Sequence, residues 1–126
     1  MEINDLSYKI IGCVYTVYNK LGPGLLESVY EKALLIELSN CGLTARSQQV
    51  IKIDYDGVPL DLDLRLDIIV EDAIVLELKS VEKLLPVHFK QLFTYLRLTD
   101  KRLGLLINFN VDNITKDGIK RVVYKI

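Results

Sequence analysis

The first forty residues carry apolar side chains three or four positions apart, which is the spacing of amphipathic helices. This pattern predicts a helix from about residue 5 to 20, behind the capping candidates Asn4 and Asp5. The segment Gly22-Pro23-Gly24 ends it, and a second helix is expected to follow and to stop at Gly42. The expected core stripe of this second helix consists of Leu26, Val29, Ala33 and Ile36, widened by Leu34 and Leu38.

After Gly42 the apolar residues recur at every second position, which is typical of half-buried strands. A strand around residues 50–53 leads to the hairpin signal Asp56-Gly57, and a long strand is expected from Leu60 to Val70. Residues 73–79 form a further apolar segment behind the turn at Glu71-Asp72. These three segments predict a β-meander.

Helical spacing returns at Pro86, which suits the first position of a third helix that extends to about Thr99. Its expected core face consists of Phe89, Leu92, Phe93 and Leu96. The apolar run from Leu103 to Phe109 predicts a buried strand, and residues 122–124 predict a last short one. The order of two helices, three strands, one helix and two strands predicts an α/β fold with a mixed sheet.

With 126 residues the chain is long enough for one packed core, so we expect a single domain over residues 1–126. No apolar run approaches the roughly 18 residues that span a bilayer, and the acidic start of the chain is unlike a signal peptide. We therefore expect a cytoplasmic protein with no membrane partner. Cys13 and Cys41 are too few for a disulfide framework and are expected to be buried thiols on helices.

The net charge of −1 does not by itself indicate a nucleic-acid partner. The charges are unevenly distributed, because residues 1–63 hold 5 basic and 9 acidic side chains (net −4) and residues 64–126 hold 11 and 8 (net +3). Six of these basic residues lie between Lys79 and Arg102. Such a run is more often a solvated helix face than a phosphate-binding surface, and both interpretations stay open.

The most specific chemistry lies on the second and third strands of the meander. Asp67 shares a strand face with Arg65, Asp63 and Asp61, and Glu77 shares a face with Lys79 on the next strand. A two-residue loop between the strands would put Asp67 and Glu77 on opposite sides of the sheet, whereas a three-residue loop over 71–73 would place them directly opposite one another. Two adjacent carboxylates repel unless a cation lies between them.

A divalent metal ion would relieve that repulsion. Mg²⁺ takes oxygen ligands and keeps several waters, so Asp67, Glu77 and the backbone carbonyl of Leu78 would hold it loosely. Lys79 would then orient or deprotonate a bound water, or neutralise charge on a phosphate. The alternative is a cross-strand salt bridge on a solvated sheet face, and Glu27 likewise needs no function in the first turn of a helix.

Several short motifs add a family resemblance. The segment Gly24-Leu-Leu-Glu27-Ser-Val-Tyr30 matches the signature of the GxxExxY family, and other segments follow in the family's order: Tyr55-Asp-Gly-Val58, Arg65-Leu-Asp67, Glu77-Leu-Lys79, Val81 to His88, Gln91 to Tyr95 and Gly104 to Phe109. The chain therefore resembles this family over about residues 8–124. The family is similar to the PD-(D/E)xK nuclease superfamily, which implies a restriction-endonuclease-like core.

The resemblance implies a role for each matching position. Asp67 and Glu77 would bind Mg²⁺ or Mn²⁺, Lys79 would be the catalytic lysine, and Glu27 would be a further acid at the metal. Gln91 and Tyr95 look like the QxxxY element of RecB-like nucleases, which contacts the substrate strand. Leu66 stands where the superfamily name has a proline.

Three more residues are candidates for substrate binding. Tyr30 would stack on a base or, alternatively, pack at the edge of the core. Arg65 would bind phosphate or neutralise Asp63 and Asp67, and Lys83 would help position the strand.

The function expected from these residues is metal-dependent hydrolysis of DNA phosphodiester bonds. The alternative is a catalytically silent domain that keeps the nuclease fold for binding or assembly, because a net charge of −1 leaves little basic area for gripping a duplex. The 50% hydrophobic content also favours an apolar surface covered by a second copy, so a homodimer is a further expectation.

Overall fold

A computed structural model describes residues 1–61 and 63–125 of the chain. Two helices come first, followed by five strands, a third helix and the last two strands. The elements are α1 (Ile3–Leu21), α2 (Glu27–Asn40), β1 (Ala45–Val50), β2 (Ile53–Tyr55), β3 (Val58–Leu60), β4 (Arg65–Val70), β5 (Ile74–Lys79), α3 (Pro86–Thr99), β6 (Leu103–Asn108), the π-helix η1 (Ile114–Gly118) and β7 (Ile119–Val123).

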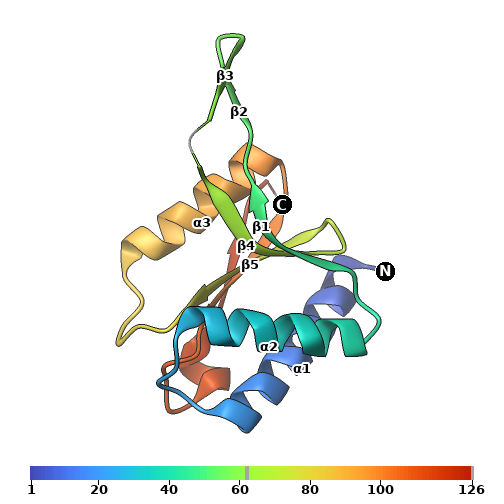
Figure 1. Cartoon of the computed structure of the whole chain (residues 1–126), viewed down its shortest axis with the longest axis vertical. Coiled ribbons are helices and arrows are strands. Elements are labelled where there is room, and N and C mark those ends of the chain that lie inside the picture. Colours follow the sequence, from blue (N-terminus) through green and yellow to red (C-terminus); the bar gives the residue numbers. More distant parts are fainter. Residues whose placement is uncertain (62, 126) are drawn as a thin grey trace.

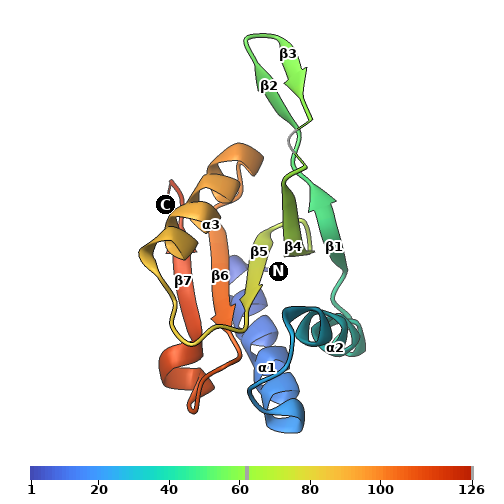
Figure 2. The same ribbon diagram turned by 60° about the vertical axis from the view of Figure 1, so that its left-hand side comes forward.

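The main sheet has five strands in the order β1-β4-β5-β6-β7. Strands β5 and β6 are parallel, and the other neighbours are antiparallel. Helices α1 and α2 cover one face of this sheet and α3 lies on the other (Figures 1 and 2). The predicted α/β class with a mixed sheet is confirmed, and the arrangement is consistent with a restriction-endonuclease-like fold.

The sheet separates two apolar clusters. The larger cluster packs α1 and α2 against one face and includes Ile10, Leu34 and Ile68. The smaller cluster packs α3 against the other face and includes Val75, Leu92 and Leu96. Alternate residues of β5 therefore enter different clusters, and the side chains of Glu77 and Lys79 follow Val75 onto the α3 side.

The predicted core face of α2 is wrong in part. Its buried residues are Tyr30, Leu34 and Leu38, whereas Leu26, Val29 and Ile36 are exposed. Both sets recur at helical spacing, so periodicity alone does not choose between them. The choice follows from packing, because the ring of Tyr30 stacks on that of Phe109 with centroids 4.2 Å apart.

The long strand predicted from Leu60 to Val70 is interrupted. Strands β2 and β3 form a separate two-stranded hairpin around the turn at Asp56-Gly57, where both residues have positive φ. This hairpin projects beyond the rest of the chain (Figures 1 and 2). Strand β4 starts only at Arg65 and Asp63 has a left-handed φ of 52°, so the alternation of Asp67 with Asp63 and Asp61 is not maintained.

Two smaller expectations are also corrected. Phe93 is 40% exposed and meets Tyr124 edge-on, while Tyr95 takes the buried position on α3. Cys13 is buried as expected, but Cys41 follows the end of α2 and is exposed. The π-helix η1 was not predicted.

Within residues 1–61 and 63–125, no helix combines the length and apolar character needed to cross a bilayer.

Candidate active site

The turn between β4 and β5 decides the geometry of the carboxylates. Residues 71–73 form a three-residue turn, and the strands pair Val70 with Ile74 and Ile68 with Leu76. This register puts Asp67 opposite Glu77, with both side chains on the α3 side of the sheet. Of the two alternatives open from the sequence, the three-residue loop is therefore the one that forms.

Next to Asp67 and Glu77, hydrogen bonds from backbone to side chain replace the backbone ladder between β4 and β5. The regular ladder between β4 and β5 ends at the pair Ile68–Leu76. Beyond it, the backbone N–H of Leu78 donates to Asp67 Oδ2 at 2.9 Å, and the backbone N–H of Asp67 donates to Glu77 Oε1 at 3.3 Å. Each carboxylate thus satisfies a backbone donor of the opposite strand, which fixes both side chains at the open end of the strand pair.

The electrostatics of the pair are unfavourable without a cation. Glu77 is only 5% exposed, and this burial, with the negative charge of Asp67 beside it, raises the pKa of Glu77 from its ordinary 4.5 to about 8. Burial also raises the pKa of Asp67. The positive charge of Lys79 lowers the pKa of both carboxyls, so it lies close enough to offset part of the repulsion.

Helix α3 contributes a second layer over the carboxylates. Tyr95 is buried beside them, and burial followed by the charge of Glu77 raises the pKa of its hydroxyl. The nearby side chain of Gln91 lowers the pKa of Tyr95 and so opposes that shift. Gln91 itself is exposed. The spacing of four residues therefore puts Gln91 and Tyr95 on one face of α3 and brings the tyrosine to the acidic pair.

Glu27 is placed differently from the prediction. The hydroxyl of Ser80, one residue beyond β5, donates to the carbonyl of Leu25 at 2.5 Å, so the start of α2 lies near the end of β5. Glu27 itself is exposed in the first turn of α2. In the part of the chain that the structure covers, no three His, Cys, Asp or Glu side chains form a group able to hold a metal, so the expected trio with Asp67 and Glu77 does not assemble.

Tyr30, a predicted substrate-binding residue, lies in the core. Its ring is fully buried against Phe109, its hydroxyl donates to the carbonyl of Gly22 at 2.6 Å, and the N–H of Leu25 donates to it at 3.1 Å. Tyr30 therefore anchors the Gly22–Gly24 turn to the core, which was the alternative that the sequence left open.

The two basic candidates have different surroundings. Arg65 donates from Nε and Nη2 to Asp63 Oδ1 at 3.1 and 3.0 Å, so it neutralises Asp63 at the exposed start of β4. Lys83 lies in the loop that follows β5 and lines a cavity of about 330 Å³ together with Asn108, Asp117 and Lys120.

Two functional side chains were missed from the sequence. Gln48 in β1 lies opposite Asp67 and lowers the pKa of that carboxyl, and nothing distinguishes it from its polar neighbours in the sequence. Asn108 is 1% exposed, accepts from the N–H of Val81 and donates to the carbonyl of Val81, and thereby fixes the loop after Lys79. A polar residue at the end of the apolar run 103–107 was the available signal for Asn108.

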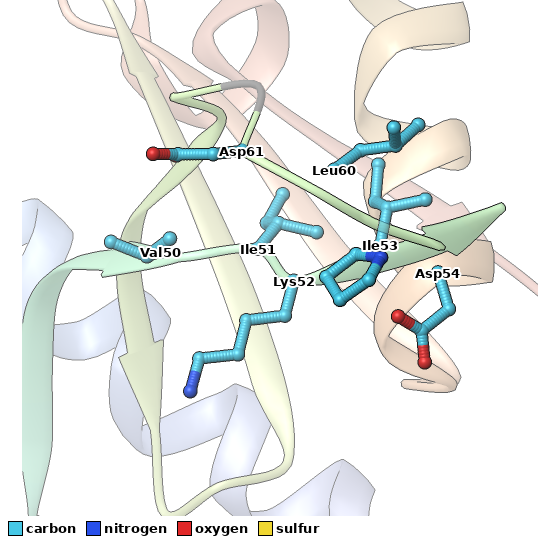
Figure 3. Close-up of a pocket in the computed structure, with 8 residues that line it drawn as sticks. Val50, Ile51, Lys52, Ile53, Asp54, Leu60 and Asp61 are labelled. Atoms are coloured by element: carbon cyan, nitrogen blue, oxygen red, sulfur yellow. The ribbon is translucent and has the colours of Figure 1, made fainter. Parts of the chain in front are cut away.

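A larger cavity lies elsewhere. It measures about 410 Å³ and forms at the base of the projecting hairpin, between residues 50–54 and 59–61. Figure 3 shows Ile51 and Ile53 beside Leu60, with the charged ends of Lys52 and Asp54 directed away from them. None of the predicted site residues lines this cavity.

A paired Asp and Glu at the open end of a β-hairpin, with a lysine two residues after the Glu, define a nuclease-like site on an α/β fold. A family model described as the PD-(D/E)XK nuclease superfamily matches residues 4–122, and the chain belongs to this superfamily. No curated protein and no solved structure gives a significant match. The narrower assignment to the GxxExxY family stays a prediction.

Proposed function

We propose that the protein is a metal-dependent nuclease that hydrolyses DNA phosphodiester bonds. The observation that carries this proposal is the juxtaposition of Asp67 and Glu77 on neighbouring strands, with Glu77 buried and Lys79 on the same face. Membership of the PD-(D/E)XK nuclease superfamily supports the same reaction. A buried carboxylate beside a half-buried one is unfavourable for stability alone, so a role in binding a cation explains why Glu77 and Asp67 stand together.

The available ligands suit a hard divalent ion. Asp67 and Glu77 offer carboxylate oxygens, and the N–H of Leu78 points toward Asp67, so the carbonyl of Leu78 lies on the same edge of β5. An all-oxygen set with few protein ligands fits Mg²⁺ or Mn²⁺. When bound, such an ion supplies a nucleophilic water and stabilises negative charge on the phosphoryl oxygens.

The other residues of the site would position the substrate or offset negative charge. Lys79 carries a positive charge beside both carboxylates and is placed to orient the attacking water or to neutralise the phosphate. Gln91 and Tyr95 present an amide and a hydroxyl over the site from α3, where they would position the DNA strand. Arg65 and Lys83 lie farther out and would contact phosphates beyond the scissile bond.

A silent binding or assembly module remains the second candidate function. Exposed apolar side chains at the hairpin, Tyr55 at 68% and Val58 at 58%, favour it, because they are suited to contact with another macromolecule, including a second copy of the chain. This function requires no divalent ion. The two proposals therefore predict different responses of the protein to Mn²⁺.

Metal titration and DNA digestion separate these functions. We expect Mn²⁺ at millimolar concentration to raise the melting temperature of the wild type, because it binds the folded state, and to support cleavage of labelled single-stranded, duplex or flap DNA. Asp67→Asn keeps the oxygen that accepts from Leu78 but removes the charge, and should lose both responses. A wild type that shows neither stabilisation nor cleavage with Mg²⁺ or Mn²⁺ would rule out the nuclease and leave the module.

A further inference from the structure

Gln48 lies directly opposite the first metal-binding candidate. Strand β1 pairs Ser47 with Ile68 and Gln49 with Leu66, so Gln48 lies opposite Asp67 on the neighbouring strand β4. Glu77 faces Asp67 from the other side. Three neighbouring strands therefore bring an amide, an Asp and a Glu into one row at the open end of the sheet.

The backbone of Gln48 is unusual for a strand. Its φ is +54°, in the left-handed region, although the register on both sides of it is regular. A side chain with a Cβ is disfavoured in this conformation, and such a residue persists only where its surroundings determine it. The surroundings here are Glu31, which accepts from the side chain, and Asp67 on the neighbouring strand.

The amide of Gln48 is anchored to helix α2. Its Nε2 donates to Glu31 Oε1 at 2.7 Å. The side chain of Gln48 also lowers the pKa of Asp67, and the amide nitrogen has a second N–H group that is available to that carboxylate. Glu31 lies one turn after Glu27 on α2, so the acid of α2 that the structure connects to the strand position opposite Asp67 is Glu31.

We propose that Gln48 is a positioning residue, which holds the Asp67 carboxylate in place for metal binding while Glu31 orients its amide. This inference rests on the proposed function, because it concerns the same carboxylate pair. Partners that orient metal ligands commonly change metal affinity or activity by about 10- to 100-fold when they are removed. The left-handed backbone at residue 48 is then the conformation that directs the side chain toward both partners.

The test compares glycine substitutions at two neighbouring glutamines. Gln48→Gly removes the amide and relieves the left-handed backbone, so we expect a melting temperature within about 2 °C of the wild type. We expect the Kd for Mn²⁺, measured by calorimetry on the full chain, to rise about tenfold and kcat to fall by a similar factor, with the KM for DNA unchanged. Gln49→Gly should lower the melting temperature by about 3 °C and leave Mn²⁺ affinity unchanged.

A double variant tests the link to α2. Glu31→Ala should weaken Mn²⁺ binding about threefold, and adding it to Gln48→Gly should cause no further loss, because both changes remove one connected interaction. Unaltered Mn²⁺ affinity in Gln48→Gly, or additive losses in the double variant, would overturn the positioning role while Asp67→Asn still abolished binding. A wild type without any Mn²⁺ response would instead disprove the proposed function itself.

A second, independent observation concerns the two cysteines. The Sγ atoms of Cys13 in α1 and Cys41 after α2 are 3.4 Å apart. A disulfide has a sulfur–sulfur length of about 2.05 Å, so a combined movement of about 1.4 Å would join them. A cavity of about 340 Å³, lined by Lys9, Gly12, Thr16 and Glu37, lies beside both sulfurs and leaves room for that movement.

We infer that Cys13 and Cys41 form a reversible disulfide with a small-molecule disulfide such as oxidised glutathione. Cys41 is exposed, and its thiolate attacks one glutathione sulfur and releases one glutathione thiolate. The thiol of Cys13 then loses its proton, attacks the Cys41 sulfur and expels the second glutathione. The two protein thiols are oxidised and one glutathione disulfide is reduced to two thiols.

The experiment treats the full chain with oxidised glutathione. We expect the mass to fall by two hydrogens, both thiols to become unreactive after denaturation, and the melting temperature to rise by about 10 °C until dithiothreitol reverses it. Cys13→Ser should instead retain a glutathione adduct on Cys41. A wild type that also retains the adduct, or that does not react, would overturn the inference.

Discussion

Replacing Glu77 with glutamine is expected to stabilise the metal-free protein at pH 8 and to flatten the dependence of its stability on pH. Glutamine keeps the oxygen that accepts from the N–H of Asp67 and removes the charge that burial opposes. The variant should at the same time lose cleavage, because one of the two acidic ligands is gone. Gain of stability with loss of function is typical of residues that serve a site rather than the fold.

The raised pKa of Glu77 determines whether the stability of the protein rises or falls with pH. Between its ordinary value of 4.5 and about 8, the folded protein holds a proton that the unfolded chain has released. The contribution of Glu77 to stability is therefore complete below about pH 4.5 and is lost as the pH rises to about 8. At about 1.4 kcal/mol for each pKa unit, the free energy of unfolding falls by roughly 3–5 kcal/mol across this window.

Urea unfolding of the metal-free protein at a series of pH values would measure this loss. The wild type should become less stable from pH 5 to pH 8, and Glu77→Gln should lose much less over the same range. Glu82→Gln, which removes an exposed acid in the loop after β5, is the matched control and should follow the wild type. A wild type that is equally stable at pH 5 and pH 8 would contradict the raised pKa of Glu77.

Much of the fold follows from local patterns. Helix α3 begins at Pro86 and ends at Thr99 as the spacing predicts, and the apolar run from Leu103 becomes the buried strand β6. These elements are predictable because burial on one face gives regularly spaced apolar residues in the sequence, and burial on both faces gives a continuous apolar run. The outward and inward faces of α2 were not predictable in this way, because apolar residues surround most of that helix.

The site depends on details that the alternation of residues does not determine. One additional residue in the turn at 71–73 decides whether Asp67 and Glu77 meet or lie on opposite faces. The left-handed backbone at Gln48 and the break before Arg65 depend on contacts between distant segments. The motif residues could therefore be predicted as candidates, whereas Gln48 and Glu31 required the three-dimensional arrangement.

Replacing Lys79 with alanine is expected to reduce kcat for DNA cleavage by about 10²–10³-fold with little change in KM. Strand β5 holds this lysine rigidly, because its carbonyl accepts from the N–H of Phe109 at 3.0 Å and the register pairs Lys79 with Asn108 on β6. Its charge acts on both carboxylates and is placed where charge develops on the phosphate. The loss should therefore appear mainly in the chemical step.

Single-turnover cleavage with saturating Mn²⁺ would measure this effect, and circular dichroism would check the fold. Lys32→Ala, on the exposed side of α2, removes an equal charge far from the motif and should cleave normally. Undiminished cleavage by Lys79→Ala would remove the lysine from the mechanism.

Lys79→Arg distinguishes the two roles proposed for the lysine. Arginine keeps the positive charge but does not deprotonate in proteins, so it cannot accept a proton from the attacking water. Because the effect of Lys79 visible in the structure is electrostatic, lowering the pKa of both carboxyls, we expect Lys79→Arg to retain at least about a tenth of the wild-type rate. A rate as low as that of Lys79→Ala would instead assign Lys79 to proton transfer, and the water would then lose its proton to the lysine rather than to solvent.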